Sequence, residues 1–295
     1  MSDPFENPIN PFLNEQTSDV PATVLITLYC RAIESLSQKP ILKDLEAVSI
    51  SKKLTPLIEQ THPNLVDMVL NGKIDPDLVL RVALKARKYD QYVIDYLKKY
   101  PDAVIVNLGS GFDTRFSRID NKHLLFFDID LPNVINYKQK FIQPGERYQM
   151  IGETVFEDVW IARLNQFKNR HFLFLAENLL RHFTNDEAKS LILKIQQHFP
   201  DSELVCELFQ NNFLSGVMSM VSRNKLGGRM GMGNESESQL EIDDADEIED
   251  WHEGIKLLDE WSIFDTNHPR LGWIRSFRNN NSIRKAQWTA HYHLQ

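Results

Sequence analysis

The chain has 295 residues, of which 42% are hydrophobic, and a formal net charge of −8 at pH 7. A chain of this length can bury a substantial core as one or two domains, which suits an enzyme-sized globular protein. The negative charge argues against a nucleic-acid partner, because binding to a phosphate backbone requires a positive surface. No apolar run approaches the roughly 18–20 residues of a membrane span, so we expect no membrane partner.

The two cysteines, Cys30 and Cys206, lie in different apolar segments and lack metal-ligand spacing. We therefore expect reduced core thiols, no metal site and a cytoplasmic location. The first residues carry neither the basic nor the apolar region of a secretion signal, which agrees with that location.

The N-terminal third divides into two parts. Residues 1–20 are rich in Pro and Asn without a helical period, which predicts a flexible arm. From 21 to about 100 the apolar spacing is helical, which predicts a helical cap. Its clearest helix begins with Asp75 as N-cap and Pro76 at the first helical position.

A glycine loop follows at the start of the predicted α/β domain, residues 101–295. An apolar β-branched run stops at Gly109, Ser110 and Gly111, and Asp113 comes two positions later. Glycines allow a tight turn and a close approach to a nucleoside, because a Cβ atom there would clash.

A second apolar run, residues 124–127, ends in Asp128 and Asp130 about 20 residues after the loop. A carboxylate at the tip of this strand can accept hydrogen bonds from both ribose hydroxyls. Together, loop and strand predict the first βαβ unit of a Rossmann-like sheet that binds a nucleoside cofactor.

The residues after the loop distinguish between cofactors. A dinucleotide site favours a third glycine where this chain has Thr114, and Asp113 would repel a pyrophosphate. S-adenosylmethionine carries an ammonium and a sulfonium group, so the acidic loop favours this cofactor over a nicotinamide dinucleotide.

Several motifs then resemble one family in its own order. Residues 107–118, NLGSGFDTRFSR, resemble the signature LGaGlDTRfyR of the leucine carboxyl methyltransferase family, which includes bacterial polyketide-type carboxyl O-methyltransferases. Further similar segments lie at 23–31, 87–90, 128–135, 154–160 and 176–183. The resemblance spans roughly residues 20–210. It implies an S-adenosylmethionine-dependent O-methyltransferase with a mostly parallel sheet, helices on both faces and an N-terminal helical cap.

The resemblance also implies cofactor contacts. Arg87 would pair with the methionine carboxylate of the cofactor, and Glu177 would help to hold its amino group. Asp130 is the preferred ribose partner, with Asp128 as the alternative. The other implied cofactor residues are Gly109, Ser110, Gly111, Asp113, Leu131, Glu153 and Thr154.

The acceptor decides which other groups are needed. A carboxylate is already a nucleophile at pH 7 and needs cations to position it, whereas a phenol, with a pKa near ~10, benefits from a general base. Arg31 is the preferred carboxylate clamp, followed by Arg181 and Tyr29. His182 stands where the family has Tyr and could act as a base.

The favoured acceptor is therefore a small-molecule carboxylate. A phenolic or enolic O-methyltransferase that uses His182 as base is the first alternative, and a non-catalytic binding protein is the second. Asn178 departs from the family's Gly beside Glu177, which leaves the acceptor open. Neither the acceptor's identity nor the oligomeric state follows from the sequence.

The C-terminal part contains an insertion at about 223–253. Residues 223–233 are glycine-rich and suit either a hinged lid or a plain loop. The acidic run that follows, up to residue 253, is typical of a solvated surface. The alternating segment 287–294 predicts a closing strand at an antiparallel edge of the sheet. Upstream, Thr184 and Glu187 have the spacing of a capping box that begins a helix.

Overall fold

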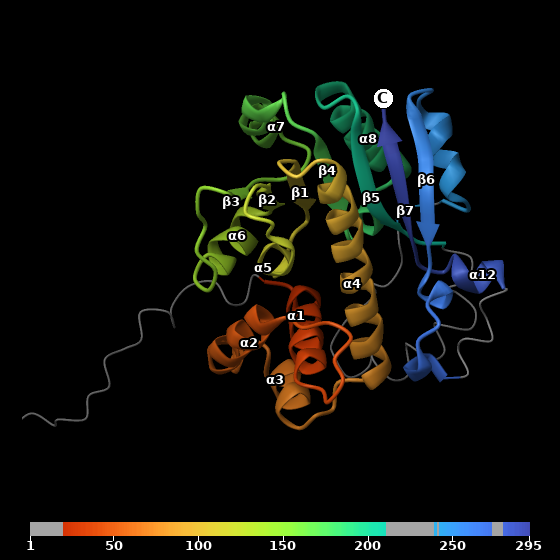
Figure 1. Cartoon of the computed structure of the whole chain (residues 1–295). Helices are drawn as coiled ribbons and strands as arrows, with labels where there is room; N and C mark the ends of the chain where they lie inside the picture. The colour runs from red at the N-terminus through yellow and green to blue at the C-terminus, as the bar shows by residue number, and fades with distance from the viewer. Residues whose placement is uncertain (1–19, 211–238, 241, 273–279) are drawn as a thin grey trace, which may run out of the picture.

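The computed structural model describes residues 20–210, 239–240, 242–272 and 280–295 (Figure 1). Its centre is a seven-stranded sheet in the order β3-β2-β1-β4-β5-β7-β6, in which β7 runs antiparallel to both of its neighbours. The strands are β1 (Val104–Leu108), β2 (Leu125–Asp130), β3 (Tyr148–Gly152), β4 (Phe172–Ala176), β5 (Ser202–Leu208), β6 (Ile255–Trp261) and β7 (Trp288–Leu294). The predicted Rossmann-like, mostly parallel sheet is confirmed.

Helices cover both faces of this sheet. Those of the described residues are α1 (Ala22–Ser35), α2 (Leu45–Ile58), α3 (Pro63–Leu70), α4 (Pro76–Lys99), α5 (Arg115–Ile119), α6 (Pro132–Lys138), α7 (Val159–Leu164), α8 (Asn185–His198) and α12 (Asn281–Arg284). Short 3-10 turns are η2 (Asn165–Phe167), η3 (Leu180–His182), η6 (Ala245–Trp251) and η7 (Ile263–Asp265).

The alternation of side chains along β1 shows how the two layers form. Val104 and Val106 belong to a core shared with α7 and α8, whereas Ile105 between them belongs to a core shared with α1 to α4. Because successive side chains of a strand point to opposite faces, a strand covered on both sides must be apolar throughout. This explains the apolar run before the glycine loop, in which the one polar residue, Asn107, is buried and donates hydrogen bonds to Asp113 and Asp128.

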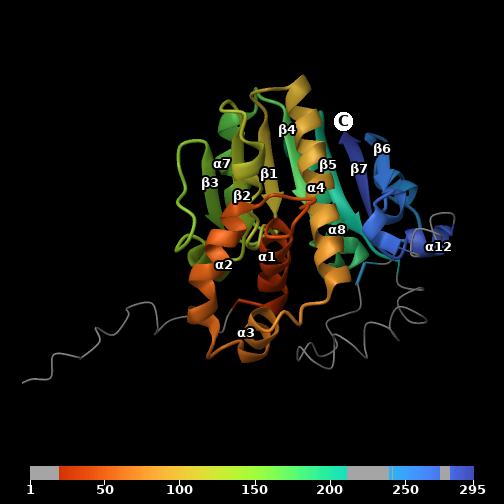
Figure 2. The same cartoon turned by 60° about the horizontal axis from the view of Figure 1, so that its bottom comes forward.

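The N-terminal helices lie at one end of the sheet and against one face (Figures 1 and 2). As predicted, α4 begins after Asp75, whose carboxylate accepts a hydrogen bond from the Asp77 N–H at 2.9 Å. Near its other end, Tyr96 donates to the Phe172 carbonyl of β4 at 2.8 Å. The helical residues thus share a core with the sheet, and the domain boundary near residue 100 stays a prediction.

The C-terminal strands correct one expectation. β7 is antiparallel as predicted, but it is not the edge strand, because β6 pairs with its outer side. Most side chains of β6 are at least partly exposed, and its sequence, IKLLDEW, lacks the regular alternation of apolar and polar residues that would have predicted a strand. The glycine-rich segment 223–233 lies outside the described residues.

Two smaller features complete the fold. Within the acidic segment, η6 begins with a capping box between Asp244 and Glu247. The capping box of Thr184 and Glu187 at the start of α8 is confirmed. In the described part of the chain, no helix is both long and apolar enough to span a membrane.

Candidate functional site

The parallel strands all end at one edge of the sheet, which we call the carboxyl edge, and the helices α1 to α3 lie beyond it (Figure 1). The residues that follow these strands therefore meet there. They include the glycine loop after β1, Asp130 at the end of β2, Glu153 after β3 and Glu177 after β4. Ligands of open α/β sheets bind at such an edge.

The glycine loop has the backbone that its sequence predicts. Gly109 and Gly111 have φ angles of +64° and +47°, in the left-handed region that favours glycine. A Cβ atom on Gly109 would lie 2.8 Å from Leu179 Cδ1, so the leucine side chain would have to move. Between the glycines, the buried Ser110 Oγ has no hydrogen-bond partner among the described residues.

The two carboxylates of β2 have different surroundings. Asp128 is buried and accepts hydrogen bonds from Asn107 (2.9 Å), Lys138 (2.7 Å) and Tyr148 (2.5 Å). This set satisfies its carboxylate within the protein, which favours a structural role.

Asp130 faces the glycine loop instead. It accepts hydrogen bonds from the backbone N–H groups of Gly111 at 2.6 Å and Leu131 at 2.7 Å. Burial raises the pKa of Asp130, although these backbone donors partly offset the effect. Of the two carboxylates, Asp130 is better placed for a ribose beside the loop.

Glu153 and its neighbours follow β3, the strand that pairs with β2. The Glu153 N–H donates to the Asp130 carbonyl at 2.8 Å, and the Glu153 carboxylate accepts from the Trp160 N–H at 2.9 Å at the start of α7. Leu131 is exposed and Thr154 is half-buried beside them. The side chain of Glu153 thus stabilises a helix start, and a contact between this segment and adenine remains a prediction.

An arginine that the sequence analysis did not assign joins the edge to the helices. Arg115 donates from Nε to Asp90 of α4 at 2.8 Å and from Nη2 to Glu177 at 2.9 Å. Its third nitrogen, Nη1, binds Asp113 of the glycine loop. The side chain is only 1% exposed, so these three carboxylates together compensate the burial of one positive charge.

A second arginine extends this network. Arg118 binds Asp90 at 2.7 Å and Asp44 at 2.7 Å. Asp44 also pairs with Arg31 at 3.0 Å, and Arg31 Nη2 donates to the Phe112 carbonyl at 2.5 Å. We call Arg31, Asp44, Asp90, Asp113, Arg115, Arg118 and Glu177 the charge network.

This network changes the interpretation of Arg31. The residue was the preferred acceptor clamp, but its guanidinium group is buried and holds Asp44 and a backbone carbonyl. Tyr29, another proposed acceptor contact, is also buried and its hydroxyl lies 3.0 Å from Thr55 Oγ1. These contacts favour structural roles for both residues.

Asp113 is a carboxylate at neutral pH. Burial would raise its pKa, but the charges of Arg115 and Arg118 outweigh burial and lower it. Its two oxygens accept from the Arg115 N–H at 2.9 Å and from Asn107 at 3.1 Å, besides the Arg115 side chain. Its hydrogen-bonding capacity is therefore largely used within the protein, and its predicted interaction with the cofactor would act mainly through charge.

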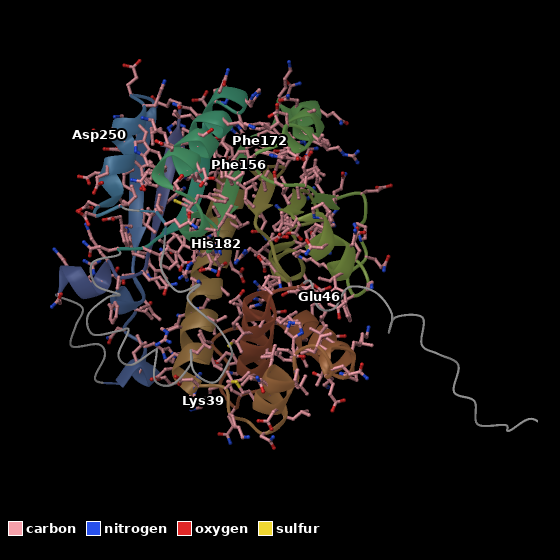
Figure 3. The ribbon with its side chains drawn as sticks, turned by 180° about the vertical axis from the view of Figure 1, so that it is seen from behind. Lys39, Glu46, Phe156, Phe172, His182 and Asp250 are labelled. Atoms are coloured by element: carbon pink, nitrogen blue, oxygen red, sulfur yellow. The ribbon has the colours of Figure 1, made fainter. Side chains whose placement is uncertain are left out.

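The remaining predicted residues are not members of the charge network. Arg87 is exposed on α4. Arg181 is half-buried, with its guanidinium group 4.8 Å from the ring centre of Phe209, and burial lowers its pKa. His182 is exposed at the end of η3, at the end of the sheet nearest the N-terminal helices (Figure 3).

The departure at Asn178 has a conformational explanation. Its φ angle is +59°, a left-handed conformation that glycine adopts freely and that asparagine tolerates better than most residues. The replacement of the family's Gly therefore preserves the turn after Glu177.

One further cation at the carboxyl edge was not predicted. Lys85 of α4 lies 3.0 Å from both carboxylate oxygens of the buried Glu207 and 3.8 Å from Glu177 Oε1. Gln287 also donates to Glu207, at 2.6 Å. Asp90, Arg115 and Arg118 fall inside motifs that resemble the family, which was the one signal that could have identified them.

The edge fits S-adenosylmethionine. The loop offers a close approach to a nucleoside, the orphaned Ser110 hydroxyl offers an unused polar group, and Asp130 stands at the end of the neighbouring strand. The charge network holds four carboxylates and three guanidinium groups, which leaves one net negative charge. This sign complements the ammonium and sulfonium groups of the cofactor.

The network predicts a pH-dependent loss of stability. Burial opposes ionisation of Asp44, but Arg31 and Arg118 lower its pKa in the folded state. Asp44→Asn should therefore lower the free energy of unfolding at pH 7 by about 3–5 kcal/mol, the usual cost of breaking a buried ion pair. The loss should persist above pH ~4, the ordinary Asp value, and shrink only as pH falls toward the lowered folded pKa.

Urea unfolding at a series of pH values measures this difference. Asp95→Asn is the matched control, because Asp95 pairs with Lys98 on the exposed surface and should lose less than about 1 kcal/mol. Equal losses in the two variants at pH 7 would show that the network adds no stability.

Comparison with known proteins identifies the family of the chain. The model of the family described as leucine carboxyl methyltransferase matches residues 24–196, which is more than half of the chain. The tetracenomycin polyketide synthesis O-methyltransferase TcmP of Streptomyces glaucescens is 23% identical over 245 residues and 83% of each chain. The S-adenosyl-L-methionine-dependent methyltransferase dpfgK of Gibberella zeae is 26% identical over 90% of this chain and 89% of its own.

Solved structures are more distant. An O-methyltransferase family protein from Burkholderia thailandensis is 15% identical, with a TM-score of 0.41 over 75% of this chain and 60% of its own. From the family match, the chain belongs to the leucine carboxyl methyltransferase family and is an S-adenosylmethionine-dependent O-methyltransferase.

Proposed function

We propose that this enzyme methylates a carboxylate of a small, polyketide-like metabolite in the cytoplasm. The acceptor class follows the polyketide context in the name of its relative TcmP. The observation that carries the carboxylate assignment is the half-buried guanidinium group of Arg181 in η3, which follows the end of β4. A macromolecular acceptor such as a nucleic acid is disfavoured by the net charge of −8.

The chemistry needs little more than positioning. S-adenosylmethionine supplies an activated methyl group on its sulfonium sulfur. A carboxylate with an ordinary pKa near ~4 is ionised at pH 7, so no protein base is required. The residues of the site therefore contribute by orienting the acceptor oxygen and excluding water.

Arg181 replaces Arg31 as the proposed acceptor clamp. Arg31 is buried and paired with Asp44. Arg181 lies in η3, four residues after Glu177, and is half-buried beside Phe209. A guanidinium group in such a setting can bind a carboxylate through two parallel hydrogen bonds. The aromatic ring beside it would also suit an aromatic metabolite.

The alternative is a phenolic or enolic acceptor with His182 as base. His182 is exposed, and an imidazole can accept a proton near neutral pH. The two functions differ in their products, because a carboxylate gives a methyl ester and a phenol gives a methyl ether.

The product identifies the acceptor group. Incubation with methyl-labelled S-adenosylmethionine and matched aromatic carboxylic acids and phenols should transfer label to the acids. The labelled ester should release methanol in mild base, whereas an aryl ether would retain its label. Transfer only to the phenols, into a base-stable product, would contradict the carboxylate assignment.

Two variants test the roles of Arg181 and His182, with the carboxylic acid that the native enzyme methylates most efficiently as the acceptor. Arg181→Met should raise the KM for this acceptor about tenfold or more, because a hydrogen bond to a charged group contributes about 1.5–3 kcal/mol. The KM for S-adenosylmethionine should change less than about twofold. His182→Phe should keep kcat near that of the native enzyme, and a severe loss of kcat near pH 7 would instead indicate a base.

A further inference from the structure

We propose that Arg115 is a positioning residue for the methionine end of the cofactor, acting through Glu177. The inference rests on the cofactor site at the carboxyl edge and does not depend on the acceptor. Arg115 begins α5 and its side chain is 1% exposed, so it does not itself reach a ligand through open solvent. Its importance lies in the three carboxylates that it holds.

Each of these carboxylates comes from a different part of the fold. Asp90 belongs to α4, Asp113 to the glycine loop and Glu177 to the end of β4. One rigid guanidinium group thus connects the two strands that border the cofactor site with the helix that covers them. A planar fork with five donors can make these bonds at once, whereas the point charge of a lysine cannot.

Glu177 is the carboxylate that remains open to a ligand. Its side chain is 23% exposed, compared with 9% for Asp90 and 12% for Asp113. Arg115 binds only Oε2 of Glu177, at 2.9 Å, and the other oxygen lies 3.8 Å from Lys85. Arg115 therefore fixes the side chain while leaving Oε1 able to accept from the amino group of the cofactor.

Loss of the guanidinium group would disturb this arrangement in a defined way. Asp90, Asp113 and Glu177 would be close together with too little positive charge between them, and like charges repel. Glu177 is the most exposed of the three and has Lys85 as its other cation. We expect it to turn toward Lys85, which would move Oε1 away from the methionine end of the site.

Arg118 provides a matched control on the same helix. It shares Asp90 with Arg115 and pairs with Asp44, and its side chain is 9% exposed. It differs in its contacts at the carboxyl edge, where it reaches Asp113 at 3.7 Å and has no ion pair with Glu177 among the described residues. A lysine substitution there should disturb the charge network without moving Glu177.

The test compares two ligands that differ at the methionine end. S-adenosylhomocysteine carries the amino and carboxylate groups, whereas 5′-methylthioadenosine keeps the nucleoside but lacks both. Isothermal titration of the full-length protein should show that Arg115→Lys weakens S-adenosylhomocysteine about tenfold or more. Binding of 5′-methylthioadenosine should change less than about twofold. Arg118→Lys should lose similar thermal stability but bind both ligands within about twofold of the native protein.

A double-mutant cycle shows whether Glu177 is the intermediary. Glu177→Gln should itself weaken S-adenosylhomocysteine, and adding Arg115→Lys to it should cost little more, because the two changes interrupt the same contact. Full additivity of the two losses would overturn the proposal. Equal weakening of both ligands by Arg115→Lys would also overturn it, since that result indicates a general collapse of the site.

The test remains decisive if Arg115→Lys does not fold. Asp90→Asn removes one of the carboxylates that Arg115→Lys would leave without its partner. In that case, ligand binding by the double variant Asp90→Asn/Arg115→Lys is compared with binding by Asp90→Asn alone. Selective loss of S-adenosylhomocysteine binding would support the proposal, and unchanged selectivity would overturn it. If the native protein binds neither ligand, the cofactor site itself is wrong and the inference fails with it.

Discussion

The charge network is the constraint on which the rest of the structure depends. A buried guanidinium group is costly unless carboxylates surround it, so Arg115 requires α4, the glycine loop and β4 to meet at one point. Arg118 and Arg31 extend the same requirement to Asp44 before α2. The pairing therefore holds the N-terminal helices over the carboxyl edge. It also leaves a small excess of negative charge where a cationic cofactor would bind.

The site follows from the sheet that this network borders. Parallel strands end together, so the glycine loop, Asp130 and Glu177 become neighbours although almost 70 residues separate the first from the last. The two carboxylates of β2 then differ in their hydrogen-bond partners. The Asp128 carboxylate accepts hydrogen bonds from Lys138, Tyr148 and Asn107. The Asp130 carboxylate instead accepts a hydrogen bond from the backbone N–H of Gly111 in the glycine loop.

Much of this could be predicted from local sequence. The glycine loop, the start of α4 at Asp75 and the cap of α8 depend on contacts within a few residues, and the structure confirms all three. Arg31 shows where local reasoning ends. Its planar guanidinium group suggested a carboxylate clamp, but it binds Asp44, which lies beyond its own helix, and the carbonyl of Phe112, 81 residues away. Likewise, β6 pairs with β7, and its sequence, which lacks a regular alternation of apolar and polar residues, does not indicate this pairing.

The central claim is that the cofactor lies at the carboxyl edge between the glycine loop, Asp130 and Glu177. A crystal structure of the protein with S-adenosylhomocysteine tests it most directly. The account predicts the ribose hydroxyls within hydrogen-bonding distance of the Asp130 carboxylate and the amino group beside Glu177 Oε1. A nucleoside bound elsewhere, or a ribose held by Asp128 in place of Asp130, would contradict it.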